Sequence, residues 1–479
     1  MRRAWLVSFL GVALLADRSA AQPEPQPKDG KVTVALTVSP AAPPRPVSKY
    51  YLTPEYRDLQ PGEKVGGFLR SFMEQNVFYN KENTEKRQKW LEMPLAELPP
   101  DVREQAGIKS GIAYDPPYAT MMVFIDQAAR YTRTEWNEWF NLRHDGAYAI
   151  LPELQKMREL ANVLRLRMRG EVKNGEFGRA VETVKSLFGL ARACEQHPTL
   201  IANLIGMAIL AQAVHGLEEM VQQPGCPNLF WSLTDLPSPV LDLHYGLGGE
   251  RLFVTAQFGP LLRADRPLTD RDLANYLTQL DEITAMAGDG ARKRPSETFR
   301  TRADDKDRVE AARKRLVESG QFSADAVKGF PPLQVLLTDD LTRFETYRDE
   351  MMKWLNLPYP QAAAGVAREE ERFKTAGSDL VIGPLLMPAV LKVKQAQART
   401  DQRFAYLRVI EAIRLYAHEN GGQLPPSLDA INLPLPADPV SGKPFRYALK
   451  DGVATLTGEN PNPGNERTNR VYEITIRKE

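Results

Sequence analysis

The chain has 479 residues, which is enough for two or three domains and a sizeable hydrophobic core. Hydrophobic residues make up 43% of it and charged residues 26%, and this composition excludes disorder along the whole chain. Lys and Arg number 62 against 61 Asp and Glu, so the overall charge does not favour nucleic-acid binding by a basic surface. We therefore expect a globular protein that binds no nucleic acid.

The first residues have the pattern of a secretory signal. Arg2 and Arg3 precede an apolar run over 4–16, and the small residues at 19–21 match what signal peptidase requires. We predict a signal peptide over 1–21, cleaved after Ala21, and an exported, periplasmic or extracellular protein. The apolar run is shorter than the ~20 residues that span a membrane, and an uncleaved anchor is the alternative.

The next part of the chain predicts a tether followed by helices. Residues 22–47 are rich in proline and predict a mobile tether, with one strand at 31–38 where apolar residues alternate. A helical domain is predicted over 48–287. Its centre is typical of helical hairpins, with helices over 152–172 and 176–196 and a third beginning at 198–199. The turn at 175–180 resembles a single tetratricopeptide-repeat turn, without the period of a repeat array.

An uncharged run over 198–217 is long enough to cross a membrane. It contains Asn203, Gln212 and His215 and follows an amphipathic hairpin, which favours a helix buried on all sides. We therefore predict no transmembrane span in the mature chain. The membrane helix is the alternative.

The second half of the chain predicts three segments. Residues 288–308 are charged and contain glycine, which indicates a flexible linker. Helices continue over 309–400, where Pro384 and Pro388 are expected to interrupt an apolar stretch. Residues 401–479 predict an α+β module with a helix to residue 420 and strands at 447–449, 452–456 and 472–476. The predicted fold class is mainly α: a helical hairpin array followed by this small module of one helix and an antiparallel sheet.

The two cysteines, Cys194 and Cys226, are predicted to be free thiols. The helix between them would be roughly 35 Å long, whereas the Cα atoms of a disulfide lie within about 7 Å. A disulfide is the alternative if Gly206 or Gly216 breaks that helix. The same separation disfavours a zinc site formed by the cysteines and His197.

The chain carries none of the common hydrolase, metalloprotease or nucleotide-binding motifs, and no cofactor is predicted. Glu135 and Glu138 are the candidate catalytic pair, because two carboxylates can act as acid and base on a glycan while Trp136 and Trp139 stack on sugars. The alternative places both glutamates on the solvated edge of a helix and the tryptophans in its apolar stripe.

Asp438 and Asp451 are candidate calcium ligands, because calcium favours carboxylates on flexible loops. The simpler interpretation of Asp438 is that its side chain caps the turn that begins at Pro439.

Parts of the chain resemble two known families. Residues 46–54, 227–237 and 249–251 resemble segments of a family of uncharacterised, exported bacterial proteins of similar length. After the helix that ends near residue 420, Gly422, Pro425 and Leu428 form a G-x-x-P-x-x-L turn, and residues 438–447 form a D-P-x-x-G-x-P-x-x-Y loop. This order resembles the globular domain of type II secretion pseudopilins and implies a structural module of the cell envelope.

The function that these patterns favour is a non-enzymatic envelope protein, a scaffold or partner-binding module whose partner is another envelope protein. The first alternative is a glycan-acting envelope enzyme that uses Glu135 and Glu138. The second is a component of a secretion apparatus. The sequence does not indicate the oligomeric state.

Overall fold

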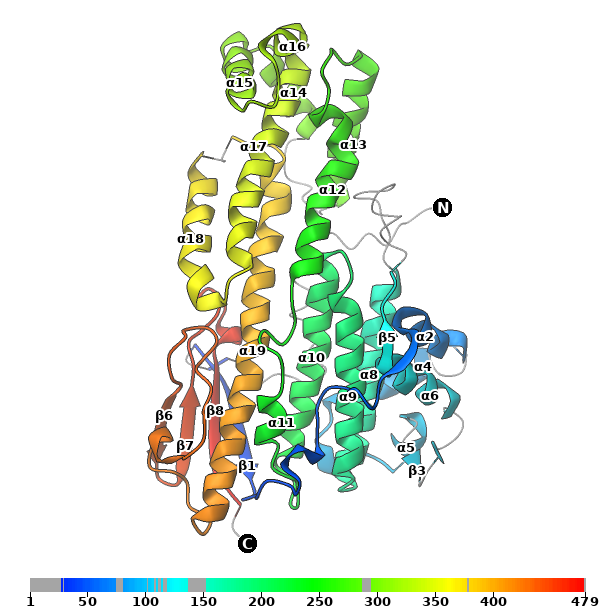
Figure 1. Ribbon diagram of the computed structural model, residues 1–479, viewed down its shortest axis with the longest axis vertical. Helices are drawn as coiled ribbons and strands as arrows, with labels where there is room; N and C mark the ends of the chain where they lie inside the picture. Colours follow the sequence, from blue (N-terminus) through cyan, green and yellow to red (C-terminus); the bar gives the residue numbers. More distant parts are fainter. Residues whose placement is uncertain are drawn as a thin grey trace.

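The computed structural model describes residues 27–28, 30–74, 81–100, 102–106, 109–110, 113–114, 119–136, 152–286, 294–376 and 379–477. The predicted signal peptide therefore lies outside the described residues. The described chain is mainly helical and ends in a small sheet packed on a helix, which confirms the predicted fold class. The molecule is elongated, with its longest helices along the long axis (Figure 1).

The first part of the chain contains short elements. These are β1 (Val32–Val38), η1 (Val47–Lys49), β2 (Gln60–Glu63), α2 (Lys64–Arg70), η2 (Ser71–Glu74), α4 (Lys81–Glu92), η3 (Leu95–Glu97), α5 (Val102–Gln105), β3 (Lys109–Ser110), β4 (Ala113–Tyr114), α6 (Ala119–Arg130) and β5 (Tyr131–Arg133).

Longer helices follow: α8 (Pro152–Lys173), α9 (Phe177–Glu195), α10 (Leu200–Met220), α11 (Phe230–Thr234), α12 (His244–Leu262), α13 (Asp270–Met286), α14 (Pro295–Ala303), α15 (Lys306–Glu318), α16 (Ala324–Gly329), α17 (Pro332–Leu355), α18 (Tyr359–Ala376) and α19 (Gly383–Glu419). The chain ends with η5 (Leu428–Ala430), β6 (Arg446–Lys450), β7 (Val453–Thr457), η6 (Glu466–Thr468) and β8 (Arg470–Ile476).

The three-helix body α8–α9–α10 forms where the sequence predicts helical hairpins. Gly175 takes a φ of 72° in the first turn, a conformation that costs glycine little. Thr199 caps α10, because its hydroxyl accepts the backbone N–H of Ala202 at 3.3 Å. Helix α10 is apolar and long enough to cross a membrane, but 83% of its most apolar window is buried inside the molecule. This burial accounts for the absence of charged residues over 200–217, as the core-helix interpretation expects.

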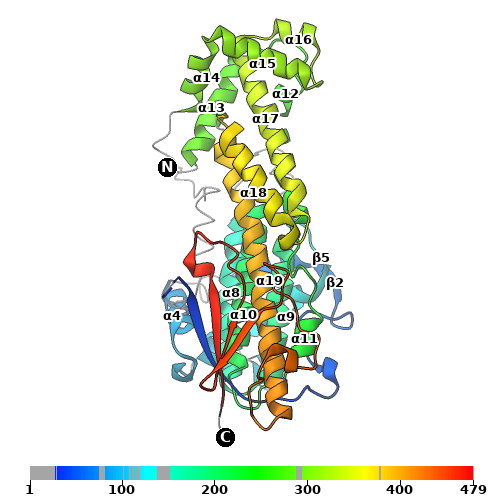
Figure 2. The same cartoon turned by 90° about the vertical axis from the view of Figure 1, so that its left-hand side faces the viewer.

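Helix α19 does not break at its prolines. Pro384 lies in the first turn, where backbone N–H groups form no hydrogen bond within the helix, so a proline there costs no bond. The helix then continues through Pro388 to Glu419. Its 37 residues correspond to a length of about 55 Å. The helix runs from beside α17 past α10 to the C-terminal sheet (Figures 1 and 2). The predicted domain boundary at residue 400 falls inside this helix.

The predicted flexible linker over 288–308 is wrong for its described part. Helix α14 begins at Pro295, and Asp305 caps α15 by accepting the backbone N–H of Arg308 at 3.1 Å. Phe299 is buried in a separate core of residues 258–382, which we call the distal arm. The segment has few aliphatic residues, but this one aromatic side chain supplies the buried contact that fixes it. Residues 288–293 lie outside the described residues.

The C-terminal sheet has the strand order β1-β8-β7-β6. The last three strands are antiparallel, as predicted, and β1 adds to them parallel to β8, with Val32 opposite Arg470 and Val38 opposite Ile476. The strand predicted at 31–38 is confirmed, but it is no part of a mobile tether. Its apolar face is buried in the core between the sheet and α19 (Figure 2).

Candidate functional site

A cavity of about 740 Å³ lies where the three-helix body, the distal arm and the C-terminal module meet. Its walls come from residues 233–247, 355–360, 394–408 and 436–442, and we call it the α19 pocket. Ligand sites in proteins commonly have volumes of about 300–1,000 Å³ and form between structural units. A second cavity, of about 790 Å³ beside Glu218, has a similar size. The position of the α19 pocket between structural units therefore makes it the leading candidate for a binding site.

One face of α19 forms the floor of the pocket. The floor residues follow helical spacing of three and four positions, and they are Lys394, Gln397, Ala398, Asp401, Phe404, Ala405 and Arg408. The stripe has a cation at each end and a carboxylate in the middle. Fourteen positions separate the two cations, which corresponds to about 21 Å along the helix axis.

Lys394 is the buried cation of the pocket, with 5% of its surface exposed. Its ammonium donates one hydrogen bond, to Oε1 of Gln397 at 2.7 Å, and Nε2 of Gln397 donates to the carbonyl of Leu241 at 2.7 Å. Burial lowers the pKa of Lys394, while the nearby Asp401 and Asp242 oppose that shift. Among the described residues no carboxylate forms an ion pair with Lys394. An ammonium has three donors, so this one keeps capacity for an acceptor.

Asp401 and Arg408 complete the charged floor. Oδ1 of Asp401 accepts the backbone N–H of Val240 at 2.8 Å, and burial raises the pKa of Asp401 to about 7 against the effects of that bond and of Lys394. Nη2 of Arg408 donates to the carbonyl of Pro434 at 2.6 Å, and its guanidinium lies 5.2 Å from the centre of the Phe230 ring. The Nε of Arg408 has no partner among the described residues.

The walls of the pocket are apolar and its rim carries exposed apolar side chains. Leu243 and Leu355 are buried in the walls. At the rim Leu357 is 36% exposed, and Tyr245, next to the lining residue His244, is 51% exposed. Aromatic and apolar residues around a desolvated pocket are typical of the centres of protein interfaces.

The two calcium candidates lie at opposite ends of β7. Asp438 is buried and accepts four hydrogen bonds, from Nε2 of Gln402 at 2.9 Å, the N–H of Val440 at 3.0 Å, Oγ of Ser441 at 2.9 Å and the N–H of Glu459 at 2.9 Å. These donors occupy its oxygens, so it holds the turn together as the simpler interpretation expects. Asp451 is exposed in the β6–β7 turn. The described residues contain no cluster of three or more His, Cys, Asp or Glu suited to a metal ion.

Of the glycan candidates, the structure describes Glu135 and Trp136. Glu135 is exposed and pairs with Arg133 at 3.1 Å in an irregular segment, which corrects the predicted helix at this point. Trp136 is buried, and its Nε1 donates to the carbonyl of Ala193 at 2.8 Å, so it cannot stack on a sugar. Glu138 and Trp139 lie outside the described residues.

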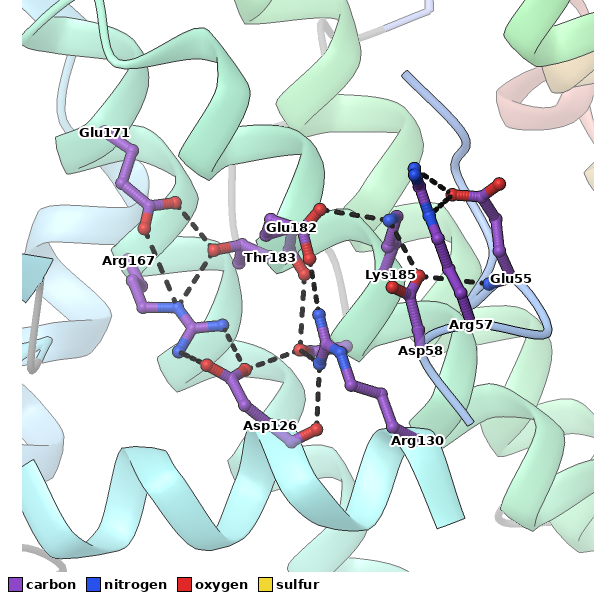
Figure 3. Close-up of polar contacts among 11 residues, drawn as sticks. Glu55, Arg57, Asp58, Asp126, Arg130, Arg167, Glu171, Glu182, Thr183 and Lys185 are labelled. Carbon is purple, nitrogen blue, oxygen red and sulfur yellow. Dashed lines mark hydrogen bonds and ion pairs between the residues drawn. The ribbon is translucent and has the colours of Figure 1, made fainter. Parts of the chain in front are cut away.

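A buried polar network ties α6 to the α8–α9 hairpin (Figure 3). Arg167 donates to Oδ1 of Asp126 at 2.8 Å and to Oγ1 of Thr183 at 2.9 Å, and Thr183 donates to Oε2 of Glu171 at 2.6 Å. Ser186 donates to Oδ1 of Asp126 at 2.6 Å. Burial raises the pKa of Glu171 to about 7, although Arg167 opposes the shift.

The network continues toward the surface (Figure 3). Arg130 donates to Oε2 of Glu182 at 2.6 Å, and Lys185 pairs with Glu182 and with Asp58, each at 3.0 Å. These contacts hold the segment around Asp58 against α9. The charged groups pair with one another, so the network stabilises the fold, whereas the α19 pocket keeps Lys394 without a carboxylate partner.

The predicted free thiols agree with the structure. Cys194 and Cys226 are both buried and unpaired, and α10 lies between them in the chain. Burial raises the pKa of each thiol to about 12, so both stay protonated at neutral pH. The helix that was expected to hold them apart is unbroken at Gly206 and Gly216.

Comparisons with protein-family models, with curated proteins and with solved structures gave no match to this chain. The architecture is a helical body and arm joined by one long helix to an α+β module. The sequence did not single out Lys394, Asp401 or Arg408 as site residues. The sequence shows that these three residues lie on one face of a helix. That face lines a pocket only after four segments that are distant in the sequence have folded together.

Proposed function

We propose that this chain is a non-enzymatic, exported envelope protein that acts as a scaffold and partner-binding module, with the α19 pocket as its binding site. The observation that carries the proposal is the pocket itself, which has ligand-binding volume, apolar walls and a buried cation. It lies between three units of the molecule, so an occupant would contact all of them and couple their positions.

The proposed partner is another protein of the cell envelope. Leu357 in the lining and Tyr245 next to the lining residue His244 are exposed apolar side chains. A small molecule inside the cavity would leave much of this apolar surface exposed. A protein segment would cover this rim and fill the pocket together. Export itself is proposed from the signal pattern, and the mature protein is expected to begin at Gln22 by mass spectrometry.

The two alternatives have different support. A glycan enzyme at Glu135 and Glu138 is disfavoured, because Trp136 is buried and supplies no stacking surface. A secretion-apparatus component gains some support from the C-terminal helix packed on antiparallel strands, since the pseudopilin resemblance implies this arrangement. It would also bind envelope partners.

Site-specific photo-crosslinking in the native envelope tests the proposal. A photoreactive residue at position 357 is expected to crosslink a discrete envelope protein, whereas one at position 317 is not. Val317 is the matched control, because it is exposed to a similar degree, 39% against 36%, but lies on α15 in the distal arm. Equal crosslinking from both positions, or none from position 357, would contradict the proposal.

A further inference from the structure

We infer that the segment bound in the α19 pocket is an extended, apolar peptide that ends in a free C-terminal carboxylate, and that Lys394 binds this carboxylate. The inference rests on the proposed function and adds the chemistry of the partner. Charge, length and access within the pocket each support it.

The buried ammonium of Lys394 favours a ligand with a negative charge. Lys394 is 5% exposed, yet the one hydrogen bond that its ammonium donates within the described part of the chain goes to the neutral amide of Gln397. A buried cation that no carboxylate contacts directly is costly, and a carboxylate of the ligand within hydrogen-bond distance would relieve that cost. Asp401 and Asp242 are close enough to raise the pKa of Lys394. Among the described residues, however, neither forms an ion pair with it, and Oδ1 of Asp401 accepts the N–H of Val240.

The length of the floor favours an extended chain over a compact molecule. Lys394 and Arg408 are about 21 Å apart along α19, and an extended peptide rises about 3.3 Å per residue. Roughly six residues would therefore follow the floor. Phe404 and the leucines of the walls would contact apolar side chains of such a segment, while Asp401 offers an acceptor in the middle for its backbone N–H groups.

The position of Lys394 favours a chain end. Lys394 is buried, whereas Arg408, at the other end of the floor, is half-buried and Leu357 at the rim is exposed. A chain terminus can reach the buried Lys394 and stop there. A chain that passed through would need a second exit beside Lys394.

Binding of defined peptide mixtures to the full-length mature protein tests this inference. The probes are six-residue mixtures with apolar last residues, prepared once as free acids and once as C-terminal amides. We expect free acids to bind at least tenfold more tightly than amides. Lys394→Met should weaken the free acids to the level of the amides, because it keeps the apolar stem and removes the charge. Lys392→Met is the control, since Lys392 is exposed on the same helix, and it should change nothing.

Each other outcome overturns the inference. Equal binding of acids and amides would exclude recognition of the carboxylate, and this comparison on the unmodified protein does not depend on how a variant folds. Amides that end in Asp and bind like the free acids would assign a side-chain carboxylate instead. Binding of decanoate without any peptide would indicate a fatty acid. If no probe binds but position 357 still crosslinks a partner, the inference fails alone, whereas loss of that crosslink as well removes the proposed function.

Discussion

At the scale of single residues, Arg167 shows how a buried charge network sets the ionisation of its members. It gives two hydrogen bonds to Asp126, at 2.8 and 3.3 Å, while its Nε lies 4.0 Å from Glu171. Burial would raise the pKa of both carboxyls, but the closer guanidinium lowers that of Asp126 overall. The pKa of Glu171 instead rises to about 7, because Arg167 compensates less of its burial.

Glu171 should make stability depend on pH near neutrality. Its pKa in the folded state, about 7, lies above its ordinary value of 4.5. Its stabilising contribution is therefore complete below pH 4.5 and is lost as the pH rises through 7. We expect the free energy of unfolding to fall between about pH 5 and about pH 8, and Glu171→Gln to remove about 2 kcal/mol of that change.

Denaturant titrations at several pH values measure this effect. Glu85→Gln, on the exposed face of α4, is the control and should leave the pH profile unchanged. Part of the dependence should remain in the Glu171 variant, because burial also raises the pKa values of Glu250 and Asp401 to about 7. Identical profiles for the Glu171 variant and the unmodified protein would show that Glu171 is ionised normally.

At the scale of elements, helices with strong local signals were predictable and contacts between distant elements were not. The α8–α9–α10 body followed from helical periodicity, the Gly175 turn and the Thr199 cap. The helix α14 was missed because its stability depends on burying Phe299 against the distal arm, which no local pattern reveals. The α19 pocket was missed for the same reason, since only the folded chain brings its walls together.

The start of α12 shows why neighbouring glycines differ. A Cβ added to Gly249 would lie 1.7 Å from the carbonyl oxygen of Pro198, whereas one added to Gly248 would meet no atom within 4 Å. Glu250 then accepts the N–H of Leu200 at 3.2 Å, at the beginning of α10. Gly249 therefore permits the close approach that lets Glu250 cap the neighbouring helix.

Alanine at these two glycines should have opposite effects. Gly249→Ala is expected to lower the free energy of unfolding by about 1–3 kcal/mol, because the backbone of Pro198 must move. Gly248→Ala is expected to raise it by up to about 1 kcal/mol, because alanine favours a helix more than glycine does. Thermal and denaturant unfolding measure both. A destabilised Gly248 variant, or an unaffected Gly249 variant, would refute this packing.

At the scale of the whole molecule, the two ends of the described chain meet in one sheet. Strand β1 pairs with β8 along its length, and Leu36 is buried between the sheet and α19. The proline-rich composition around this strand predicted a tether, because composition describes only the segment itself. It carries no information on the pairing of the strand with β8. The sequence therefore predicted the strand correctly, but the assignment of this strand to a mobile tether was wrong.

A lysine on the buried face of β1 should loosen the C-terminal module. Leu36→Lys places a charge in the core and should cost about 3 kcal/mol or more, whereas Ala35→Lys, on the exposed face beside Glu473, should cost little. Hydrogen exchange of the β8 amides measures the difference. Equal protection of β8 in both variants would mean that β1 does not stabilise the sheet.

The most direct test of the central claim is hydrogen–deuterium exchange of the full-length protein with and without the envelope partner that crosslinks at position 357. The proposed function predicts new protection in the four wall segments, residues 233–247, 355–360, 394–408 and 436–442. Strand β6 is an edge of the sheet and offers a different docking surface. Protection confined to β6, with the four wall segments unchanged, would contradict the assignment of the α19 pocket as the binding site.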